Sequence, residues 1–353
     1  MMTVLAFLVV LSALIFVHEL GHFLVARWCG VLVERFSIGF GKEFVGWTRG
    51  HTRYSICWIP FGGYVKMGGE EAGTGTGKPW EFSSKPVWAR ALIIFAGAGF
   101  NMLFAFLVFW YIFATGHPNL AAAVGHLVEE HPAAAAGVKV GDRVLAVGGV
   151  KIQTWDDMTK QIRNSSPAGV SLSLDREGER IEIVVVPMVK EIKDIFGKTR
   201  TVNMVGIGPA QEILMLKAGP FQAAGKAAWE TLRITGYTYR GIWGVFTGGI
   251  PMKSLSGPVG IAVLSGRAAE LGFAYFLVLL ATISINLGVI NLLPLPVFDG
   301  GHLMFLAVEA LRRGRAVSEK VQLVAQQVMV FALIALMLVV TYNDFVGLIL
   351  KSG

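Results

Sequence analysis

The sequence has little charge and almost no cysteine. Asp, Glu, Lys and Arg make up 16% of its 353 residues, and only two cysteines are present. Hydrophobic residues reach 54%, against about 45–50% in soluble domains, and the mean hydropathy is +0.59. This composition excludes an ordinary soluble domain and indicates an integral membrane protein.

No basic residue precedes the first apolar run, which extends from Met2 to Ala26. A signal peptide is excluded, because the run also exceeds the length of a signal-peptide core and ends in Arg27-Trp28 without a small-residue cleavage pattern. We expect the run to be retained. Four apolar runs are each close to the roughly 20 residues that a spanning helix needs. They predict transmembrane helices at Met2 to Ala26, Ala91 to Phe113, Ala274 to Leu293 and Leu323 to Val340.

Basic residues gather in two of the segments that connect these helices. The segment between the first two helices contains Arg35, Lys42, Arg49, Arg53, Lys66, Lys78, Lys85 and Arg90, and the link between the last two contains Arg312, Arg313, Arg315 and Lys320. The positive-inside rule places both segments in the cytoplasm and both termini, with residues 117–270, outside. Cys29 and Cys57 then lie on the reducing side, where we expect free thiols. The net charge of +7 follows from this bias, so no nucleic acid partner is expected.

The connecting segments show local patterns but no internal repeat. Tyr54, Ile56 and Trp58 alternate with more polar residues before a break at Pro60, which predicts a strand followed by a turn. The Gly- and Thr-rich stretch 68–79 is typical of a flexible linker. The outer segment alternates strand patterns with one short helical pattern, and it is long enough to bury a small core.

A further helical pattern extends from Phe221 to Phe246 and places Trp229, Tyr239 and Trp243 on one face. Two interpretations stay open: an interfacial helix, or a helix packed against the transmembrane helices. We therefore expect seven parts, namely transmembrane helix 1 (1–30), a cytoplasmic-side β-loop and linker (31–89), transmembrane helix 2 (90–116), an extracytoplasmic α+β domain (117–210), an interfacial helical segment (211–272), transmembrane helix 3 (273–303), and a basic loop with transmembrane helix 4 (304–353).

Two histidines and a glutamate interrupt the first apolar run in "FVHELGHFLV", residues 16–25. His18 and His22 are four residues apart and share one face of a helix, with Glu19 beside them, which is the H-E-x-x-H pattern of a zinc site with a glutamate base. Satisfied core histidines are the alternative. They are disfavoured here, because an ionisable group within a membrane needs a partner or a function.

The depth of His18 limits where a third ligand can come from. His18 lies about 16 residues into its helix, or ~24 Å at ~1.5 Å per residue, and therefore toward the cytoplasmic face. The third helix reaches the same level at "NLLPLPVFDGG", residues 291–301, where two prolines break it before Asp299. Asp299 is the predicted third ligand, and a turn or helix-cap aspartate is the alternative. Such a site activates water for peptide hydrolysis, with Glu19 as general base.

The sequence resembles the intramembrane site-2 metalloproteases, and within them the bacterial regulator of sigma-E protease group. The resemblance extends over "HELGH", "PFGGYVKMGGE", "GAGFN", "LSGPVGIA" and "NLLPLPVFDGGHL". It implies one Zn²⁺ per chain on His18, His22 and Asp299, a catalytic base at Glu19, and a substrate-contacting asparagine at Asn291. Capping of the broken helix is the alternative for Asn291, and Asn101 of "GAGFN" is interpreted as a packing hydrogen bond or a catalytic group.

The resemblance also implies the wider organisation. Residues 36–67 would form a membrane-associated β-loop whose edge strand binds the unwound substrate, with Gly62, Gly63 and Tyr64 in contact with it. Residues 117–210 look like a PDZ domain, which would filter substrates by size or bind a substrate C-terminus. Members of the group carry two such domains in tandem, whereas this chain has room for one.

The predicted protein is thus a polytopic α-helical membrane protein with four transmembrane helices, a membrane-associated β-loop and an inserted α+β PDZ domain. By resemblance it resides in a bacterial inner membrane. It would be a zinc endopeptidase that cuts the membrane segments of single-pass proteins after a first-site cut, including anti-sigma factors and remnant signal peptides. The alternatives are a membrane zinc transporter, in which ligands would continue across the bilayer, and a non-enzymatic PDZ scaffold.

Overall fold

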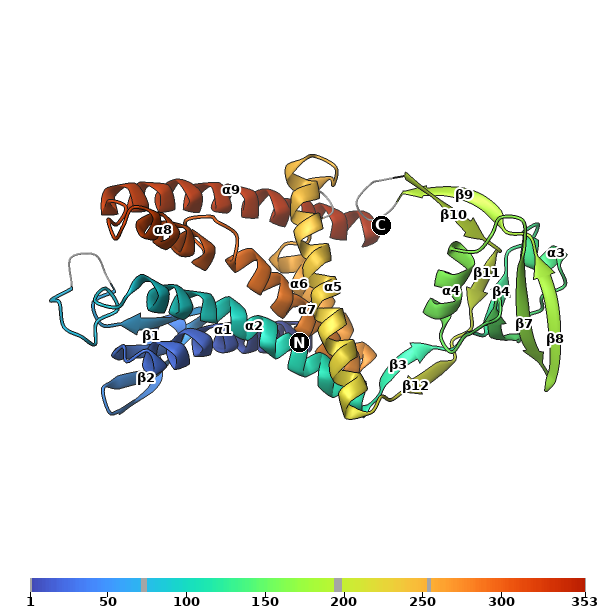
Figure 1. The fold of residues 1–353 in the computed structure, drawn as a ribbon, viewed down its shortest axis with the longest axis horizontal. Helices are drawn as coiled ribbons and strands as arrows, with labels where there is room; N and C mark the ends of the chain where they lie inside the picture. Colours follow the sequence, from blue (N-terminus) through green and yellow to red (C-terminus); the bar gives the residue numbers. More distant parts are fainter. Residues whose placement is uncertain (1, 71–74, 194–198, 253–254, 353) are drawn as a thin grey trace. The chain divides into compact units, whose positions relative to one another are not determined.

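Four long apolar helices dominate the part of the chain that the structure describes. The computed structural model describes residues 2–70, 75–193, 199–252 and 255–352, so residues 71–74 of the expected linker lie outside it. The helices long and apolar enough to cross a membrane are α1 (Met2–Trp28), α2 (Val87–Thr115), α7 (Phe273–Asn291) and α9 (Glu319–Ser352), all labelled in Figure 1. The prediction of four membrane helices is confirmed.

The chain divides into two compact units, which are described separately. The first, called here the helical unit, comprises Met1–Tyr111, Ala223–Trp243 and Pro251–Gly353. The second, called the outer unit, comprises Ile112–Gln222 and Gly244–Ile250.

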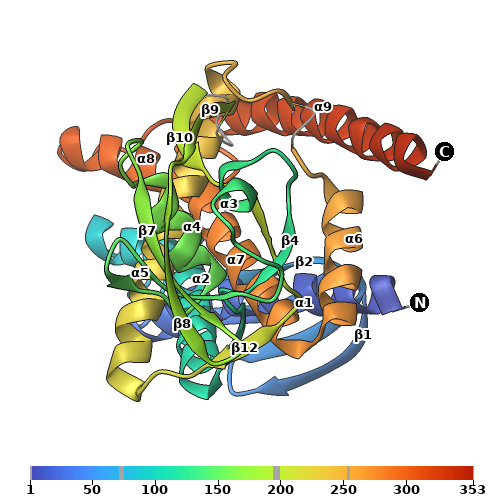
Figure 2. The same cartoon turned by 90° about the vertical axis from the view of Figure 1, so that its right-hand side faces the viewer.

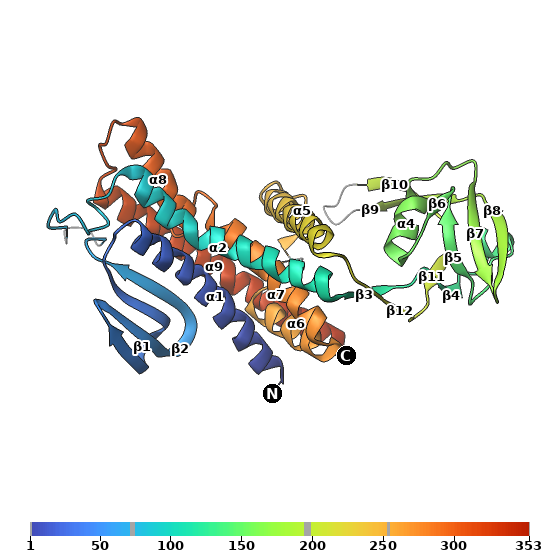
Figure 3. The same cartoon turned by 60° about the horizontal axis from the view of Figure 1, so that its bottom comes forward.

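A strongly bent β-hairpin lies beside α1 in the helical unit (Figure 3). Its strands are β1 (Val33–Arg49) and β2 (Thr52–Met67). The first half of β1 pairs on one side with the start of β2 and on the other with its end, since Ser37 lies opposite both Ser55 and Tyr64. The order across the sheet is therefore residues 43–49, 52–57, 33–38 and 63–67, and the end of β2 forms one edge.

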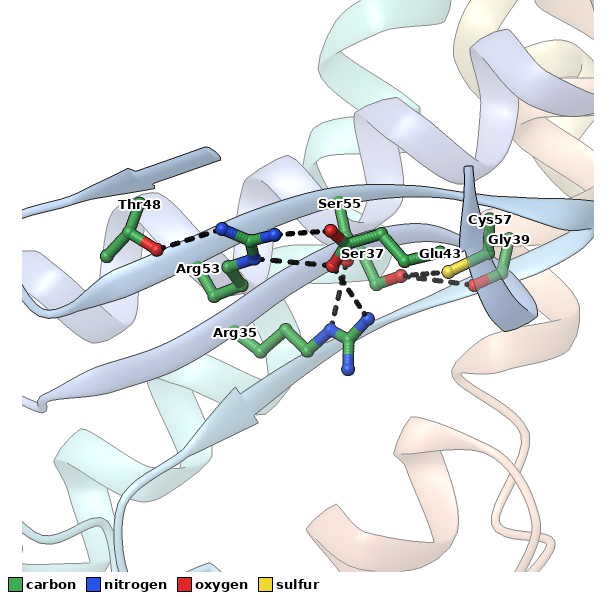
Figure 4. Close-up of polar contacts among 8 residues, drawn as sticks. All are labelled: Arg35, Ser37, Gly39, Glu43, Thr48, Arg53, Ser55 and Cys57. Atoms are coloured by element: carbon green, nitrogen blue, oxygen red, sulfur yellow. Dashed lines mark hydrogen bonds and ion pairs between the residues drawn. The ribbon is translucent and has the colours of Figure 1, made fainter. Parts of the chain in front are cut away.

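Charged side chains connect three of these four segments (Figure 4). Glu43 accepts hydrogen bonds from Arg35, at 3.4 Å, and from Arg53. Arg35 also donates to the Ser55 hydroxyl at 3.0 Å, and Arg53 donates to the Thr48 hydroxyl at 3.2 Å. Arg53 thus connects the adjacent segment 52–57 to Glu43, and Arg35 reaches Glu43 from the segment 33–38 beyond it, which holds the bend of the hairpin in place.

Three more helices complete the helical unit: α5 (Pro220–Phe246), α6 (Pro258–Leu271) and α8 (Asp299–Leu311). Two expectations need correction. The segment 211–272 contains two helices and the strand β12, because Pro258 begins a second helix and Gly272 ends it. The expected loop from residue 304 is helical as far as Leu311, since the basic residues that suggested a loop begin only at Arg312.

Helix α5 packs through one face and exposes another. Ala223 and Ala227 are fully buried, and the Thr238 hydroxyl lies 2.7 Å from Oδ1 of Asn286 on α7. Trp229 and Leu232 are more than two-thirds exposed. One face therefore packs against a transmembrane helix, as the second interpretation expects, whereas the interfacial position of the exposed face stays a prediction.

The outer unit contains a four-stranded antiparallel sheet in the order β6-β5-β7-β8, with β7 and β8 side by side in Figure 2. Its core includes Val144, Leu172 and Leu174 together with Met158 and Ile162 of α4. The elements are β3 (His117–Leu120), β4 (Val124–Leu127), α3 (Pro132–Ala135), β5 (Arg143–Val147), β6 (Val150–Lys151), α4 (Trp155–Arg163), β7 (Val170–Arg176), β8 (Glu179–Val185), β9 (Met188–Lys193), β10 (Thr199–Met204), β11 (Ile207–Pro209) and β12 (Ile213–Leu216).

A buried ion pair stabilises the outer unit. The Asp142 carboxylate is fully buried and accepts two hydrogen bonds from Arg176, each 2.8 Å long, and one from the backbone N–H of Lys139. Burial alone would raise the pKa of Asp142, but the bonds from Arg176 and Lys139 outweigh it and hold the pKa below its usual value. The pair connects the turn before β5 to the end of β7.

Candidate metal site

Helix α1 presents His18 and His22 on one face, and Asp299 at the start of α8 lies against both. The two Nε2 atoms are 3.2 Å apart. Oδ2 of Asp299 lies 3.3 Å from Nε2 of His18 and 3.6 Å from Nε2 of His22. The structure therefore brings together the three residues predicted as ligands, and they form a group that could hold a metal ion.

The spacing of these three atoms fits a zinc ion. Zinc bonds of about 2.0–2.1 Å in a tetrahedral arrangement place neighbouring ligand atoms about 3.3–3.4 Å apart. Oδ2 of Asp299 is buried and has no hydrogen-bond partner, and the side chains of His18 and Asp299 are only 12% and 18% exposed. A buried carboxylate oxygen facing two imidazole nitrogens needs a cation or a proton. The donor set of two nitrogens and one oxygen is that of a catalytic zinc site with an open position.

Helix α2 provides partners for the other ring nitrogens. Nδ1 of His22 lies 2.9 Å from the backbone oxygen of Ile93, the geometry in which Nδ1–H donates and Nε2 is left free for a metal. Nδ1 of His18 lies 3.3 Å from the Asn101 amide, and the Asn291 amide at the end of α7 lies 3.4 Å from the same nitrogen.

The position of Asp299 depends on the tight turn that follows α7. The chain leaves the helix after Asn291 and enters α8 at Asp299. A Cβ on Gly300 would overlap the carbonyl groups of Leu292 and Leu293, and a Cβ on Gly301 would overlap that of Leu295. The glycine pair is therefore required for this approach, and it lets Asp299 reach the level of the histidines.

A cavity of about 840 Å³ opens onto the site within the helical unit. Its lining includes His18, Glu19, His22 and Asp299 together with Gly63, Tyr64, Val65 and Met67 of β2. A Cβ on Gly63 would lie 3.0 Å from Cγ of Glu19, so the backbone of the edge strand passes directly beside this carboxylate side chain. Within the described residues, no strand pairs with the outer side of residues 63–67.

The remaining predicted residues lie on the same strand. The Tyr64 ring is stacked on Phe40 with a centroid distance of 6.2 Å, and the Arg35 guanidinium lies over its face. Gly62 has φ of +128°, and a Cβ there would overlap the Phe40 ring. Gly62 thus serves the turn before the edge strand, whereas Gly63 and Tyr64 line the cavity.

The structure also places two further residues that could bind a metal, and one glycine that the sequence did not single out. His302 lines the cavity but does not belong to the group of converging ligand atoms. Asp344 on α9 accepts hydrogen bonds from the backbone N–H groups of Gly257 and Gly260 and so caps the start of α6. Gly97 was not predicted, although a Cβ there would overlap Nε2 of His22 and lie 2.7 Å from Cε1 of His18.

A protein-family model matches the part of the chain that contains these three residues. The profile described as peptidase family M50 matches residues 6–336. The chain belongs to peptidase family M50.

Relatives agree with this M50 assignment over nearly the whole chain. A protein of Agrobacterium fabrum (strain C58) named "Putative zinc metalloprotease" is 36% identical over 361 residues, which cover 97% of this chain and 95% of the relative. Protease RseP of Yersinia pestis is 32% identical over 447 aligned residues, covering 96% of this chain and 97% of that protein. The chain is a zinc metalloprotease. Protease RseP is longer and has residues for which this chain has no counterpart.

The close contact at Gly97 leads to a prediction. Gly97→Ala places a methyl group where the histidine rings lie, so we expect zinc affinity to fall more than about 100-fold, beyond the range typical of losing an outer-shell partner. Gly99→Ala is the matched control on α2, since its Cβ would meet nothing closer than Phe95 at 3.4 Å. Zinc retention during chelator dialysis is measured for both variants. Equal retention in the two would show that the space at Gly97 is not needed for the metal.

Proposed function

We propose that this zinc metalloprotease is an intramembrane endopeptidase whose metal is held by His18, His22 and Asp299. The observation that carries the proposal is the convergence, at 3.2 to 3.6 Å, of the unpartnered Oδ2 of Asp299 with two Nε2 atoms that lie on α1, a helix long and apolar enough to cross a membrane. When bound, zinc activates a water molecule and polarises the carbonyl of the bond to be cut. The ionisable groups are then buried because the peptide bond is buried.

Glu19 is positioned to move the protons of this reaction. It directly follows His18 on α1 and lines the same cavity as the three proposed ligands. As general base it takes a proton from the attacking water, and it then passes that proton to the leaving amine. Asn291, whose amide lies 3.4 Å from His18, would donate a hydrogen bond to the substrate carbonyl as negative charge develops on its oxygen.

The edge strand of β2 would bind the substrate backbone. Within the described chain no strand pairs with the outer side of residues 63–65, and that strand lines the cavity beside Glu19. A helix must unwind before its peptide bonds become accessible, and an unwound segment can add to such an edge as a further strand. Gly63 permits the close approach to Glu19, and Tyr64 would contact the substrate side chains.

The substrates we propose are single-pass membrane proteins that another protease has already shortened, of the anti-sigma factor type, with remnant signal peptides as a further class. The outer unit would act as a PDZ domain that filters substrates by size or binds their C-termini. Its buried sheet and the short helix α4 are compatible with that architecture. The protein would reside in a bacterial inner membrane, with both termini and the outer unit outside and the metal site toward the cytoplasmic face. The transporter and scaffold alternatives are not retained, because the chain is a metalloprotease.

The endopeptidase proposal predicts that loss of the general base lowers activity without loss of the metal. In proteoliposomes that contain a tagged single-pass substrate without its outer part, Glu19→Gln should lower the cleavage rate by about 10²–10⁴-fold, the range typical of a general base. Zinc content should not change. Glu34→Gln is the control, since Glu34 is exposed and forms an exposed ion pair with Lys66. Cleavage by the Glu19 variant at the wild-type rate would remove Glu19 from the mechanism, and absence of cleavage by the wild-type protein would contradict the substrate class.

The proposed orientation predicts which residues an impermeant thiol reagent can reach. In a Cys29→Ser, Cys57→Ser background, we expect a cysteine at the exposed Lys78 to be protected in cells with a permeabilised outer barrier, and one at the exposed Glu179 to react. Lysis should make both reactive. The reverse pattern in unlysed cells would show that the topology is inverted and that the metal site lies toward the outer face.

A further inference from the structure

Asn101 is a buried polar residue that the catalytic proposal does not use. Its side chain is fully buried in the middle of α2, and its Nδ2 lies 3.3 Å from Nδ1 of His18. Its Oδ1 is also buried and has no hydrogen-bond partner. A buried amide oxygen without a hydrogen-bond partner is destabilising, so its position calls for an explanation.

The chemistry of the imidazole provides one. Nε2 of His18 faces Nε2 of His22 and Oδ2 of Asp299, so it must be free of a proton to bind a metal, and Nδ1 must then carry the hydrogen. A donor at Nδ1 cannot be served by the NH₂ group of the Asn101 amide. Nitrogen and oxygen of an amide exchange places by a 180° rotation, and that rotation gives Nδ1–H an acceptor and gives the orphaned oxygen a donor.

We propose that Asn101 is a positioning residue for His18: its Oδ1 accepts the hydrogen bond from Nδ1–H and thereby fixes the tautomer that leaves Nε2 free for zinc. The inference concerns the metal site alone and is independent of the proposed substrates.

The face of α2 opposite the histidines supports this role. Ile93, Gly97 and Asn101 follow one another at intervals of four residues and therefore share one face of α2. His18 and His22 share one face of α1 for the same reason. The Ile93 carbonyl accepts from His22, Gly97 leaves room for both rings, and Asn101 meets His18. One helix face thus offers an acceptor to each ring. The backbone of Gly97 also interacts with His18, so the experiment must separate its contribution from that of Asn101.

Helix α7 holds Asn101 in this position. The hydroxyl of Ser284, itself fully buried, donates to the backbone oxygen of Asn101 at 2.8 Å. A Cβ on Gly288 would lie 3.6 Å from Cβ of Asn101, so the two helix backbones pass close to one another here. The amide therefore sits at the junction of α1, α2 and α7, where it can orient a ring but has little room to move.

Two substitutions at this position test the proposal. Asn101→Asp keeps an acceptor of the same shape, whereas Asn101→Leu removes it at similar volume. We expect the Leu variant to bind zinc about 10–100-fold more weakly, as is typical when an outer-shell partner is lost, and the Asp variant to stay close to wild type. Ser265→Ala is the control, because it removes a fully buried hydroxyl of the helical unit whose hydrogen bond is to Ile261 on its own helix, away from Asn101 and His18. Zinc affinity is measured by competition with a chelator.

The second measurement uses the zinc-free protein and does not depend on activity. The ¹⁵N spectrum of histidine-labelled protein reports which ring nitrogen carries hydrogen, and the His18 signals are identified by their loss in His18→Gln. We expect Nδ1–H in the wild-type and Asp proteins and a mixture of tautomers in the Leu variant. Wild-type zinc affinity and tautomer in the Leu variant would overturn the proposal, because the Gly97 backbone or the Asn291 amide, 3.4 Å from the same nitrogen, would then suffice. Equal weakening by Asp and Leu would show that the acceptor is not what matters. If the Leu variant does not fold, the Asp variant decides: loss of affinity or of the Nδ1–H form overturns the proposal.

Discussion

Two imidazoles and a carboxylate lie together among apolar helices. Burying these polar groups is unfavourable unless they have partners, and the neighbouring elements of the helical unit provide them. A charged or polar group at membrane depth needs a partner, because no bulk water is available to it. The converging Nε2 and Oδ2 atoms leave space for a cation, and the Ile93 carbonyl provides a partner for His22. A metal site is thus the arrangement in which these buried groups are all satisfied.

The same constraint accounts for the irregular backbone around the site. The broken segment between α7 and α8 and the unpaired edge of β2 both carry backbone N–H and C=O groups that regular structure would otherwise pair. The edge of β2 lines the cavity, where water or an extended peptide can bond to it. The broken segment packs tightly on itself through Gly300 and Gly301. Around the metal site, the irregular backbone of the described residues thus lines the cavity or forms the turn that positions Asp299.

The sequence allowed the main parts of this arrangement to be predicted, because they depend on local patterns. The i, i+4 spacing of His18 and His22 is set by the helix itself, and the apolar runs specify the four long helices. Asp299 could be placed with the histidines because the topology brings the end of α7 to their depth. The roles of these residues in catalysis remain predictions, as do the contacts of Asn291 and Tyr64 with a substrate.

Other features could not be predicted, because they depend on how distant segments pack. Gly97 and Asn101 acquire their importance from the register between α1 and α2, which no single-helix pattern encodes. The double pairing of β1 requires a bend that depends on Glu43 meeting two arginines from other segments. Helix α8 was partly mistaken for a loop, because the basic residues after it were more conspicuous than the apolar pattern within it. For Asn101 the sequence did give a signal: a lone asparagine in an apolar helix predicts a buried polar contact, although not that its partner is His18.

X-ray absorption at the zinc edge tests the central claim, that His18, His22 and Asp299 hold the metal within the helical unit. The purified wild-type protein should show only nitrogen and oxygen neighbours at about 2.0–2.1 Å, with outer-shell scattering from two imidazoles. One of those two imidazoles should be lost in His22→Ala. A sulfur neighbour at about 2.3 Å, which only a cysteine or methionine could provide, or a spectrum unchanged by His22→Ala, would contradict the account.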